Sequence, residues 1–136
     1  MNSKIFQENA KVICTREIAD NTFETILYSP QISKCAKPGQ FINILPSLDW
    51  SLMMRRPMSI ASQKDSNNSI IYKVVGEGTK LMRQWKESQI IDIIGPLGNY
   101  WGGYKEYKPI LIGGGVGIAP IMNLNNYLKD IKIDNF

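Results

Sequence analysis

The first hundred residues consist of short segments with strand character separated by turn signals, and this spacing constrains the fold more than any other feature. Asp20-Asn21, Lys37-Pro38-Gly39, the segment 65–68 and Gly95-Pro96 are the turn signals. Several short strands at this spacing are typical of an antiparallel sandwich or barrel. The expected strands are 11–17, 22–28, 40–45, 57–61, 69–75 and 90–94.

The pattern changes in the last quarter of the chain. Ile110-Leu111-Ile112 is an all-apolar run, typical of a parallel strand that is covered on both faces. A glycine-rich run at 113–117, interrupted only by Val116, follows, and then a helix is predicted over 119–129. Strand, glycine turn and helix are the first elements of a βαβ nucleotide-binding unit. We therefore expect one complete domain, residues 1–103, and the first fragment of a second domain, residues 104–136.

The residue types present exclude several kinds of chemistry. The 136 residues include no His, which excludes a His-based catalytic triad and a His metal site within this chain. Cys14 and Cys35 are the only cysteines, too few for a zinc or iron–sulfur site. We expect both to be reduced thiols in a cytoplasmic protein. The net charge of +4 permits phosphate contacts without implying nucleic acid, and no signal peptide or membrane segment is expected.

The glycine run could bind a pyrophosphate. Gly115 and Gly117 lie between the expected strand and helix, where glycine lets the backbone approach a ligand and the helix N-terminus offers N–H groups. The third glycine position of a G-x-G-x-x-G motif is occupied by Pro120, which suits the first turn of a helix. The alternative interpretation is a tight turn that binds no ligand.

Two further segments could bind phosphate. Gly76-Glu77-Gly78-Thr79 precedes a short helix expected at 79–86, with Thr79 as its N-cap. In Arg55-Arg56-Pro57-Met58-Ser59, the guanidinium of Arg56 suits a phosphate, and Ser59 could donate to a heteroaromatic ring. Taken singly, the first segment is equally compatible with a capped helix on a glycine turn, and the second is more typical of an ordinary surface arginine. Their combination with the glycine run favours nucleotide binding.

Five motifs in register resemble those of the ferredoxin–NADP reductase superfamily. Within it, they are most similar to the electron-transfer subunits of NAD-dependent, class B dihydroorotate dehydrogenases. The similarity runs from about residue 8 to the last residue. The motifs are Pro38-Gly39-Gln40-Phe41, Arg56-Pro57-Met58-Ser59, Gly78-Thr79, Gly95-Pro96-Leu97-Gly98-Asn99 and the segment 113–120.

The resemblance implies a mainly β fold, a six-stranded antiparallel Greek-key barrel that binds FAD. The start of an α/β nicotinamide-nucleotide-binding domain, one strand and one helix, would follow it. Arg56 would contact the FAD pyrophosphate and Ser59 the isoalloxazine edge, while Met58 stands where an aromatic residue is common in the superfamily. The implied FAD residues are Arg56, Pro57, Met58, Ser59, Ile71, Tyr72, Lys73, Gly78 and Thr79, and the implied nicotinamide-nucleotide residues are Gly115, Gly117 and Pro120.

The resemblance also implies a function. Electrons would leave the FMN of a partner dihydroorotate dehydrogenase subunit, pass an iron–sulfur cluster, reach FAD on this chain and reduce NAD, in the synthesis of UMP. This chain and its catalytic partner would form a heterotetramer, and no residue of this chain would be catalytic. Cys14 and Cys35 match none of the family's cluster ligands. A [2Fe–2S] cluster is therefore expected only in a longer chain.

Three other interpretations remain open. Sulfhydrogenase gamma subunits and the small subunit of ferredoxin-dependent transhydrogenase share the flavin motifs and differ in partner. A small basic barrel could instead bind oligonucleotides, with Trp50, Trp85 and Trp101 stacking on bases. We expect no nucleic-acid partner, because the aromatic residues are not interleaved with Lys or Arg along one strand. We expect no membrane partner, because the sequence offers no membrane segment. The third interpretation is a flavin-binding domain that folds but has no catalytic activity.

Overall fold

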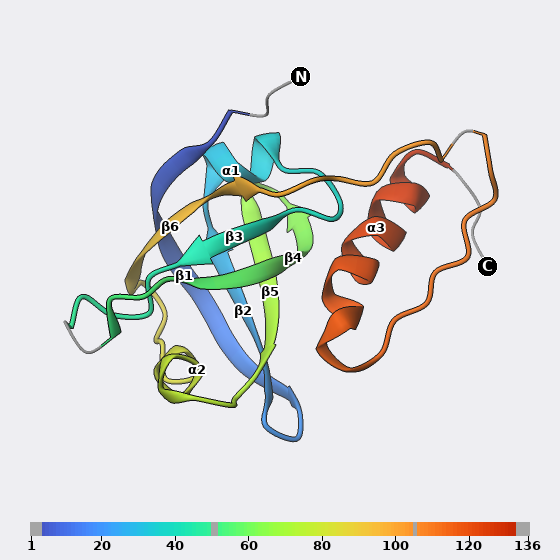
Figure 1. The fold of residues 1–136 in the computed structure, drawn as a ribbon. Helices are drawn as coiled ribbons and strands as arrows, with labels where there is room; N and C mark the ends of the chain where they lie inside the picture. Colours follow the sequence, from blue (N-terminus) through green and yellow to red (C-terminus); the bar gives the residue numbers. More distant parts are fainter. Residues whose placement is uncertain (1–3, 50–51, 105, 133–136) are drawn as a thin grey trace.

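A closed β-barrel with one long helix beside it makes up most of the structure (Figure 1). The computed structural model describes residues 4–49, 52–104 and 106–132. The strands are β1 (Phe6–Ala19), β2 (Thr22–Tyr28), β3 (Phe41–Ile44), β4 (Arg56–Lys64), β5 (Asn67–Lys73) and β6 (Ile90–Leu97). The helices are α1 (Pro30–Cys35), α2 (Glu77–Met82), the 3₁₀ turn η2 (Gly115–Gly117) and α3 (Ile118–Asp130).

The barrel confirms the predicted mainly β fold with six antiparallel strands. Its strand order is β1-β2-β5-β4-β3-β6, and β6 pairs back onto β1. Closure depends on the length of β1, whose first half pairs with β6 and whose second half pairs with β2. Lys11 lies at the crossing, opposite both Tyr28 and Ile90, and a register shift follows between Val12 and Cys14. Such shifts bend a strand, and bending is what lets one strand close two edges.

The barrel interior is filled by the inward-facing residues of every strand. Alternation places these side chains on one face, so they exclude water together. Tyr72 joins them, with its hydroxyl 3.2 Å from the Thr25 hydroxyl, and burial raises the pKa of Tyr72 to about 12. The fully buried aliphatic residues of this core are Val12, Leu27, Ile32, Ile42, Ile44, Ile60, Ile70 and Ile93.

Helix α1, which the sequence analysis did not predict, is capped by a residue far away in the chain. Glu8 of β1 is 8% exposed, and its carboxylate accepts hydrogen bonds from the backbone N–H groups of Gln31 and Ile32, both at 3.2 Å. Ser29 occupies the N-cap position without capping, and its hydroxyl accepts a hydrogen bond from Asn68 instead. The stabilising group is therefore absent from the local sequence around α1.

Glu8→Ala should lower the free energy of unfolding by about 1–2 kcal/mol, because two N–H groups at the start of α1 lose their acceptor. Urea denaturation followed by circular dichroism measures this change. Glu87→Ala, which removes an exposed carboxylate, is the matched control and should leave stability within about 0.5 kcal/mol. Equal stability of the two variants would contradict the capping role of Glu8.

The segment between β6 and α3 contains no strand in its described residues, so the strand predicted at 110–112 is wrong. A strand requires a hydrogen-bonding neighbour, and no described segment pairs with this run. Its isoleucines face solvent, with Ile110 72% and Ile112 84% exposed. The helix predicted at 119–129 is confirmed as α3, and the helix expected at 79–86 is shorter and earlier, at Glu77–Met82.

Helix α3 packs against the outer face of the barrel, and its connector runs around the side of α3 that faces away from the barrel (Figure 1). Ala119 is buried in one cluster with Ala61 of β4 and Ile71 of β5. The Asn123 amide donates to the Gln63 side-chain oxygen at 3.0 Å. Gln63 in turn donates to the backbone carbonyls of Ser33 and Ala36, at 3.0 and 2.9 Å. One glutamine of β4 thus connects α3 to α1.

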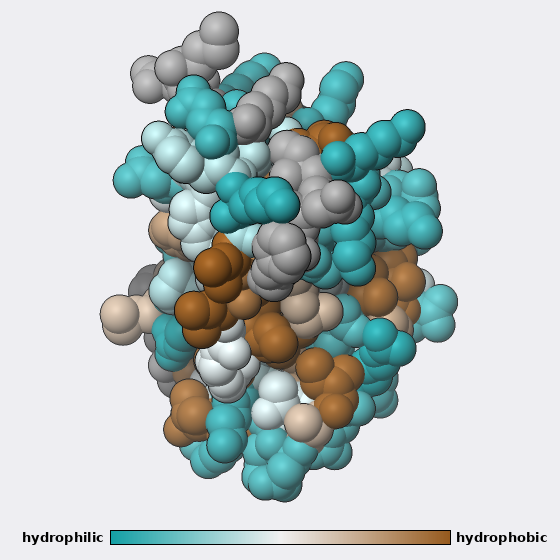
Figure 2. Space-filling view, turned by 90° about the vertical axis from the view of Figure 1, so that its right-hand side faces the viewer, coloured by the Kyte–Doolittle hydropathy of each residue, from teal (hydrophilic) through white to brown (hydrophobic). Residues whose placement is uncertain are grey.

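The outer side of α3 and its connector is apolar. Figure 2, which shows this side of the molecule, has several hydrophobic residues gathered on it. Apolar patches on a protein surface mark places where another protein surface packs. The exposed apolar residues of this region are Tyr107, Ile110, Ile112, Val116, Ile118, Met122, Tyr127 and Ile131.

Three structural facts bear on the classes of function considered above. Cys14 and Cys35 are both free thiols. Among the residues that the structure describes, no group of three acidic or cysteine side chains is placed to hold a metal ion. No described helix combines the length and apolar character needed to cross a membrane.

Candidate functional site

Arg56 and Gly78 meet at one end of the barrel. β4 begins at Arg56, and α2 covers this end, with Met82 in the barrel core. A Cβ atom added to Gly78 would lie 2.9 Å from the Arg56 Nε atom, so the guanidinium rests directly on the glycine. Any side chain at position 78 would therefore displace Arg56. The structure brings two of the three predicted phosphate-binding segments into contact.

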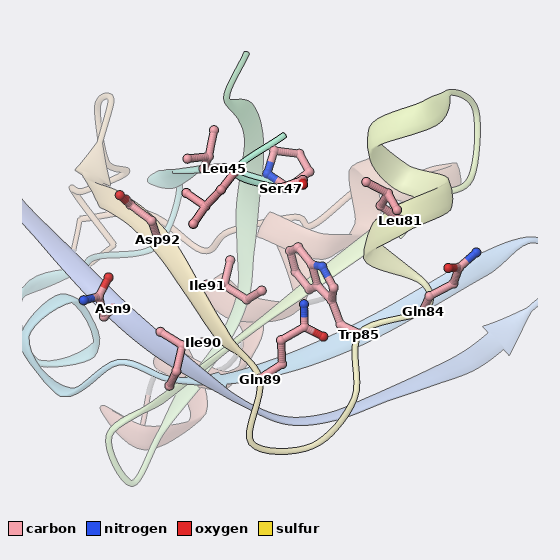
Figure 3. Close-up of a pocket in the computed structure, with 12 residues that line it drawn as sticks. Asn9, Leu45, Ser47, Leu81, Gln84, Trp85, Gln89, Ile90, Ile91 and Asp92 are labelled. Carbon is pink, nitrogen blue, oxygen red and sulfur yellow. The ribbon is translucent and has the colours of Figure 1, made fainter. Parts of the chain in front are cut away.

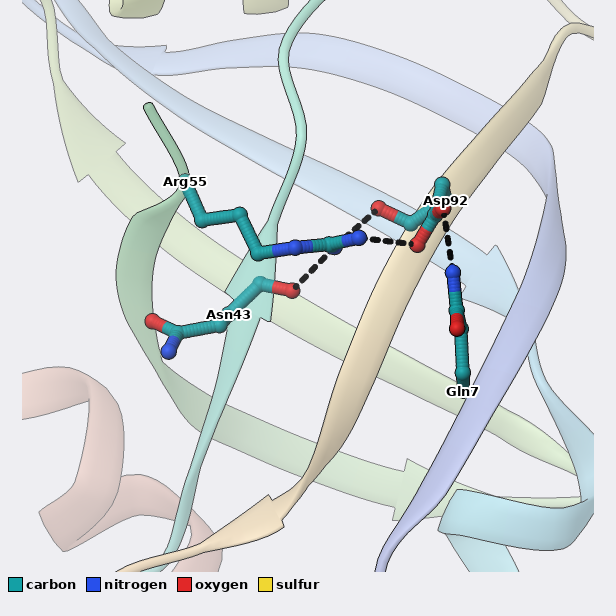
Figure 4. Close-up of polar contacts among 4 residues, drawn as sticks. All are labelled: Gln7, Asn43, Arg55 and Asp92. Atoms are coloured by element: carbon teal, nitrogen blue, oxygen red, sulfur yellow. Dashed lines mark hydrogen bonds and ion pairs between the residues drawn. The ribbon is translucent and has the colours of Figure 1, made fainter. Parts of the chain in front are cut away.

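Arg56 and its neighbour Arg55 have different electrostatic surroundings. Arg55 forms an ion pair with Asp92 at 2.7 Å and also donates to the Asn43 carbonyl, while Asp92 accepts a further bond from Gln7 (Figure 4). Arg56 donates to the Met54 carbonyl and pairs with no carboxylate among the described residues. A guanidinium without an acidic partner, beside a helix start, is suited to an anionic ligand such as a phosphate.

Thr79 is not the N-cap of α2, contrary to the prediction. The N-cap is Gly76, and Thr79 is the third helical residue. Its hydroxyl accepts hydrogen bonds from the N–H groups of Val75 and Gly76, at 3.0 and 3.2 Å, and donates to the Gly76 carbonyl at 3.0 Å. Thr79 is 7% exposed, so its side chain stabilises the turn from within. The capping hydroxyl therefore lies inside the helix and not before it.

The other β4 residues of the predicted site lie on two faces of the strand. Met58 pairs with Ile42 and packs against the barrel core. Pro57 and Ser59 alternate with it and so point outward, with Ser59 opposite Phe41. A ligand that contacts Ser59 would thus lie on the outer face of the barrel, and Met58 would support it from beneath the strand.

The three predicted residues of β5 differ in what they can offer a ligand. Tyr72 points into the barrel core, where it is 3% exposed. Ile71 is 7% exposed, in the cluster that α3 covers. Lys73 alone has an exposed side chain. Ile71 and Tyr72 could therefore contribute only backbone groups to a ligand on the barrel surface.

The glycine run lies at the start of α3. Gly115 has a φ of +54°, a left-handed conformation that favours glycine, and a Cβ at Gly115 or Gly117 would meet nothing within 4 Å. The backbone of both residues is therefore open to approach. Pro120 lies in the first turn of α3, as predicted, and the adjacent Ala119 contacts β4 and β5. The third predicted segment thus lies beside the outer face of β4 and β5.

The two described tryptophans differ in exposure and do not form one surface for stacking on bases. Trp85 is 5% exposed and belongs to the barrel core, as expected. Trp101 lies against Gly39, where an added Cβ would be 3.2 Å from its ring. Trp50 is outside the described residues. Trp85 is thus a core residue, whereas Trp101 packs on Gly39 with one part of its ring and remains 41% exposed.

A cavity of about 620 Å³ lies beside Leu81 of α2 and was not predicted from the sequence (Figure 3). Four elements form it: the loop after β3, the end of α2 with Trp85, the start of β6, and β1 at Asn9. No motif links these residues, because each belongs to a segment whose local pattern signals only a strand, a loop or a helix. The cavity could therefore not be predicted from the sequence.

Comparison with known proteins found no matching family model, but it found relatives that match most of the chain. The chain is 37% identical over 125 residues to a dihydroorotate dehydrogenase B (NAD(+)) electron transfer subunit of Bacillus pumilus, covering 86% of this chain and 47% of the relative. The same kind of subunit from Fusobacterium nucleatum is 38% identical over 116 residues, covering 79% of this chain and 44% of the relative. The chain spans about half the length of these relatives.

Solved structures of reductases share the fold of this chain. An NADH-dependent reduced ferredoxin–NADP oxidoreductase superimposes with a TM-score of 0.80 at 33% identity, over 94% of this chain and 46% of that one. Phthalate dioxygenase reductase superimposes with a TM-score of 0.78 at 18% identity, over 96% of this chain and 42% of that one. The second likeness supports the fold alone.

Proposed function

We propose that the chain belongs to the ferredoxin–NADP reductase superfamily, binds FAD and carries electrons between FAD and NAD(H). We propose further that it is part of an electron-transfer subunit of the dihydroorotate dehydrogenase B type, as its relatives are named. The observation that carries the proposal is the contact between Arg56 and Gly78, two motif residues from separate segments.

The residues at this end of the barrel fit the pyrophosphate of FAD. Arg56 has no carboxylate partner among the described residues and lies over Gly78, where the missing Cβ leaves room for it. The start of α2 adds backbone N–H groups that lack helical partners. On the outer face of β4, Ser59 would lie at the isoalloxazine ring, with Lys73 nearby on the adjacent strand. All of these side chains belong to the FAD site predicted from the sequence.

FAD, when bound, supplies hydride exchange with a nicotinamide and single-electron exchange with an iron–sulfur centre. The chain's own residues bind and orient it. The sequence contains no His, and Tyr72, with its pKa raised to about 12 by burial, stays neutral at physiological pH. We accordingly assign no acid, base or nucleophile to this chain.

We propose that residues 104–136 are part of a nicotinamide-nucleotide-binding domain and residues 1–103 the flavin domain. Two observations support this division: the connector leaves the barrel after β6, and its apolar side chains face outward rather than into the barrel. Gly115, Gly117 and Pro120 would then lie where a nicotinamide nucleotide approaches FAD.

We propose a catalytic dihydroorotate dehydrogenase subunit containing FMN as the partner, in a heterotetramer that acts in UMP synthesis. The names of the relatives support this assignment, and the two free thiols support a cytoplasmic location. The [2Fe–2S] cluster would lie on residues other than Cys14 and Cys35. A reductase that exchanges electrons with ferredoxin is the second candidate, since an NADH-dependent reduced ferredoxin–NADP oxidoreductase is 33% identical to this chain.

The test is a visible absorption spectrum of the purified chain after incubation with FAD and removal of excess cofactor. Flavin absorption that stays with the protein, with its fluorescence quenched, is the expected result. Protein that retains no flavin at any FAD concentration would contradict the proposal. Co-purification with dihydroorotate dehydrogenase, compared with ferredoxin, separates the two candidate partners.

A further inference from the structure

The start of β4, which carries Arg56, pairs with only one neighbouring strand among the described residues. Residues 56–59 pair with β3, whereas the pairs between β4 and β5 begin at Ile60. One of the pairs with β3 joins Asn43 to Pro57, and proline has no N–H group to donate. Backbone pairing is therefore a weak constraint on the position of Arg56.

The two arginines at this point are neighbours in the chain, and their side chains point in opposite directions. Successive side chains of an extended chain alternate between two faces, so one arginine reaches β6 and the other lies on α2. A local shift of one residue in the pairing with β3 would exchange Arg55 and Arg56. Because the two side chains are identical, the arginines themselves do not oppose this exchange.

Asp92 of β6 distinguishes the two arginines. Its carboxylate pairs with Arg55 at 2.7 Å, and Arg55 also donates to the backbone carbonyls of Asp92 and Asn43, at 3.3 and 3.5 Å (Figure 4). The other carboxylate oxygen of Asp92 accepts a hydrogen bond from Gln7 of β1 at 2.8 Å. The side chains of Arg55 and Asp92 are 24% and 22% exposed, so salt screens this pair less than a fully exposed pair. The residue before β4 is thus fixed to β3 and β6.

We propose that the Arg55–Asp92 ion pair positions Arg56 for the pyrophosphate of FAD by setting the register at the start of β4, an inference that rests on the proposed function. Arg55 and Asp92 are positioning residues that act through Arg56. With Arg55 held at β6, Arg56 points to α2 and its guanidinium lies on Gly78. The charge of Arg55 is neutralised by Asp92, so Arg55 does not compete for the phosphates.

The first test measures the FAD affinity of Asp92→Asn by titration followed by flavin fluorescence. This variant keeps the shape of the side chain and removes its negative charge, so a general charge effect would raise the affinity for an anionic ligand. We expect the opposite, a fall of roughly three- to tenfold, because Arg56 is no longer held at Gly78. Glu24→Gln is the matched control: it removes the carboxylate that pairs with Arg16 at 2.6 Å, and it should change the affinity by less than about twofold.

The second test shows whether Asp92 acts through Arg56. In the Arg56→Ala chain, Asp92→Asn should change the affinity by less than about twofold further, because the group that it positions is already absent. A fall of equal size with and without Arg56 would mean a general loosening of the barrel and would overturn the inference. Unchanged or raised affinity in Asp92→Asn alone would overturn it too.

Arg55→Lys provides an independent variant, since it keeps the charge pair with Asp92 and loses the bonds to the two carbonyls. We expect a smaller fall in FAD affinity, again absent in the Arg56→Ala chain. Circular dichroism checks that each variant is folded, and Arg55→Lys decides the question if Asp92→Asn does not fold. An unmodified chain that binds no FAD overturns the proposed function and the inference with it, whereas every other outcome leaves FAD binding intact.

Discussion

Arg56→Ala lowers the affinity of the chain for FAD by roughly 10- to 100-fold, the effect of losing hydrogen bonds between charged partners. The structure explains why this arginine and not its neighbour has that effect. Arg56 is not paired with a carboxylate among the described residues and lies against the start of α2, whereas Arg55 is held by Asp92. Titration of FAD into the purified chain, followed by flavin fluorescence, measures the change.

Two variants control for this result. Arg83→Ala removes an exposed arginine just beyond α2, with the same change of charge, and should alter the affinity by less than about twofold. Arg56→Lys keeps the charge but loses the planar set of donors, so its affinity should lie between those of the unmodified chain and Arg56→Ala. Unaltered FAD affinity in Arg56→Ala would sink the placement of the pyrophosphate at this end of the barrel.

The strands could be predicted because each has one face in the barrel core. β2 was predicted with its bounds, since turn residues flank a run of alternating burial. The start of β1 was missed, although it follows the same alternation: Glu8 occupies one of its inward positions and breaks the apolar pattern. The same carboxylate caps α1. One long-range contact therefore explains why neither the start of β1 nor α1 could be predicted from local sequence.

The run at 110–112 shows the converse error. Its composition is that of a buried strand, but a strand exists only where another segment offers hydrogen bonds, and composition carries no information about that segment. Local pattern was sufficient for α3, because a helix satisfies its own backbone. The glycines before α3 leave the backbone open to approach whether or not the run at 110–112 forms a strand.

Residues of the candidate site could be predicted only where they belong to a sequence motif. Arg56 and Gly78 came from such motifs, and their contact is a property of the fold. For Ile71 and Tyr72, the motif could not show that one side chain lies under α3 and the other inside the barrel. The cavity beside α2 has no motif, so it could be found only from the structure.

One motif proves to be structural. Gly39 has a φ of +100°, and the Trp101 ring packs against it. The backbone N–H of Trp101 donates to the Pro38 carbonyl at 3.0 Å. Phe41 lies over Gly98, where a Cβ would come within 2.8 Å of its ring. The motif Pro38-Gly39-Gln40-Phe41 therefore holds the chain as it leaves β6, and so sets the path of the connector toward α3.

Gln40→Leu tests this function of the motif, and we expect it to lower the free energy of unfolding by roughly 2–4 kcal/mol. Gln40 is fully buried; its amide oxygen accepts the Lys37 N–H at 2.9 Å, and its amide nitrogen donates to the Gly98 carbonyl at 3.0 Å. Leucine has a similar volume, so the loss comes from two polar backbone groups that are left without partners and not from a void.

Urea denaturation measures the change. Gln31→Leu, at an exposed position of α1, is the matched control and should alter stability by less than about 0.5 kcal/mol. Amide hydrogen exchange adds a readout specific to the contacts of this motif. In the variant, the backbone N–H groups of Lys37 and Trp101 should lose protection before those of the barrel strands do. A loss below about 1 kcal/mol would mean that water replaces the glutamine and that the connector is held by the aromatic contacts of Trp101 and Phe41 alone.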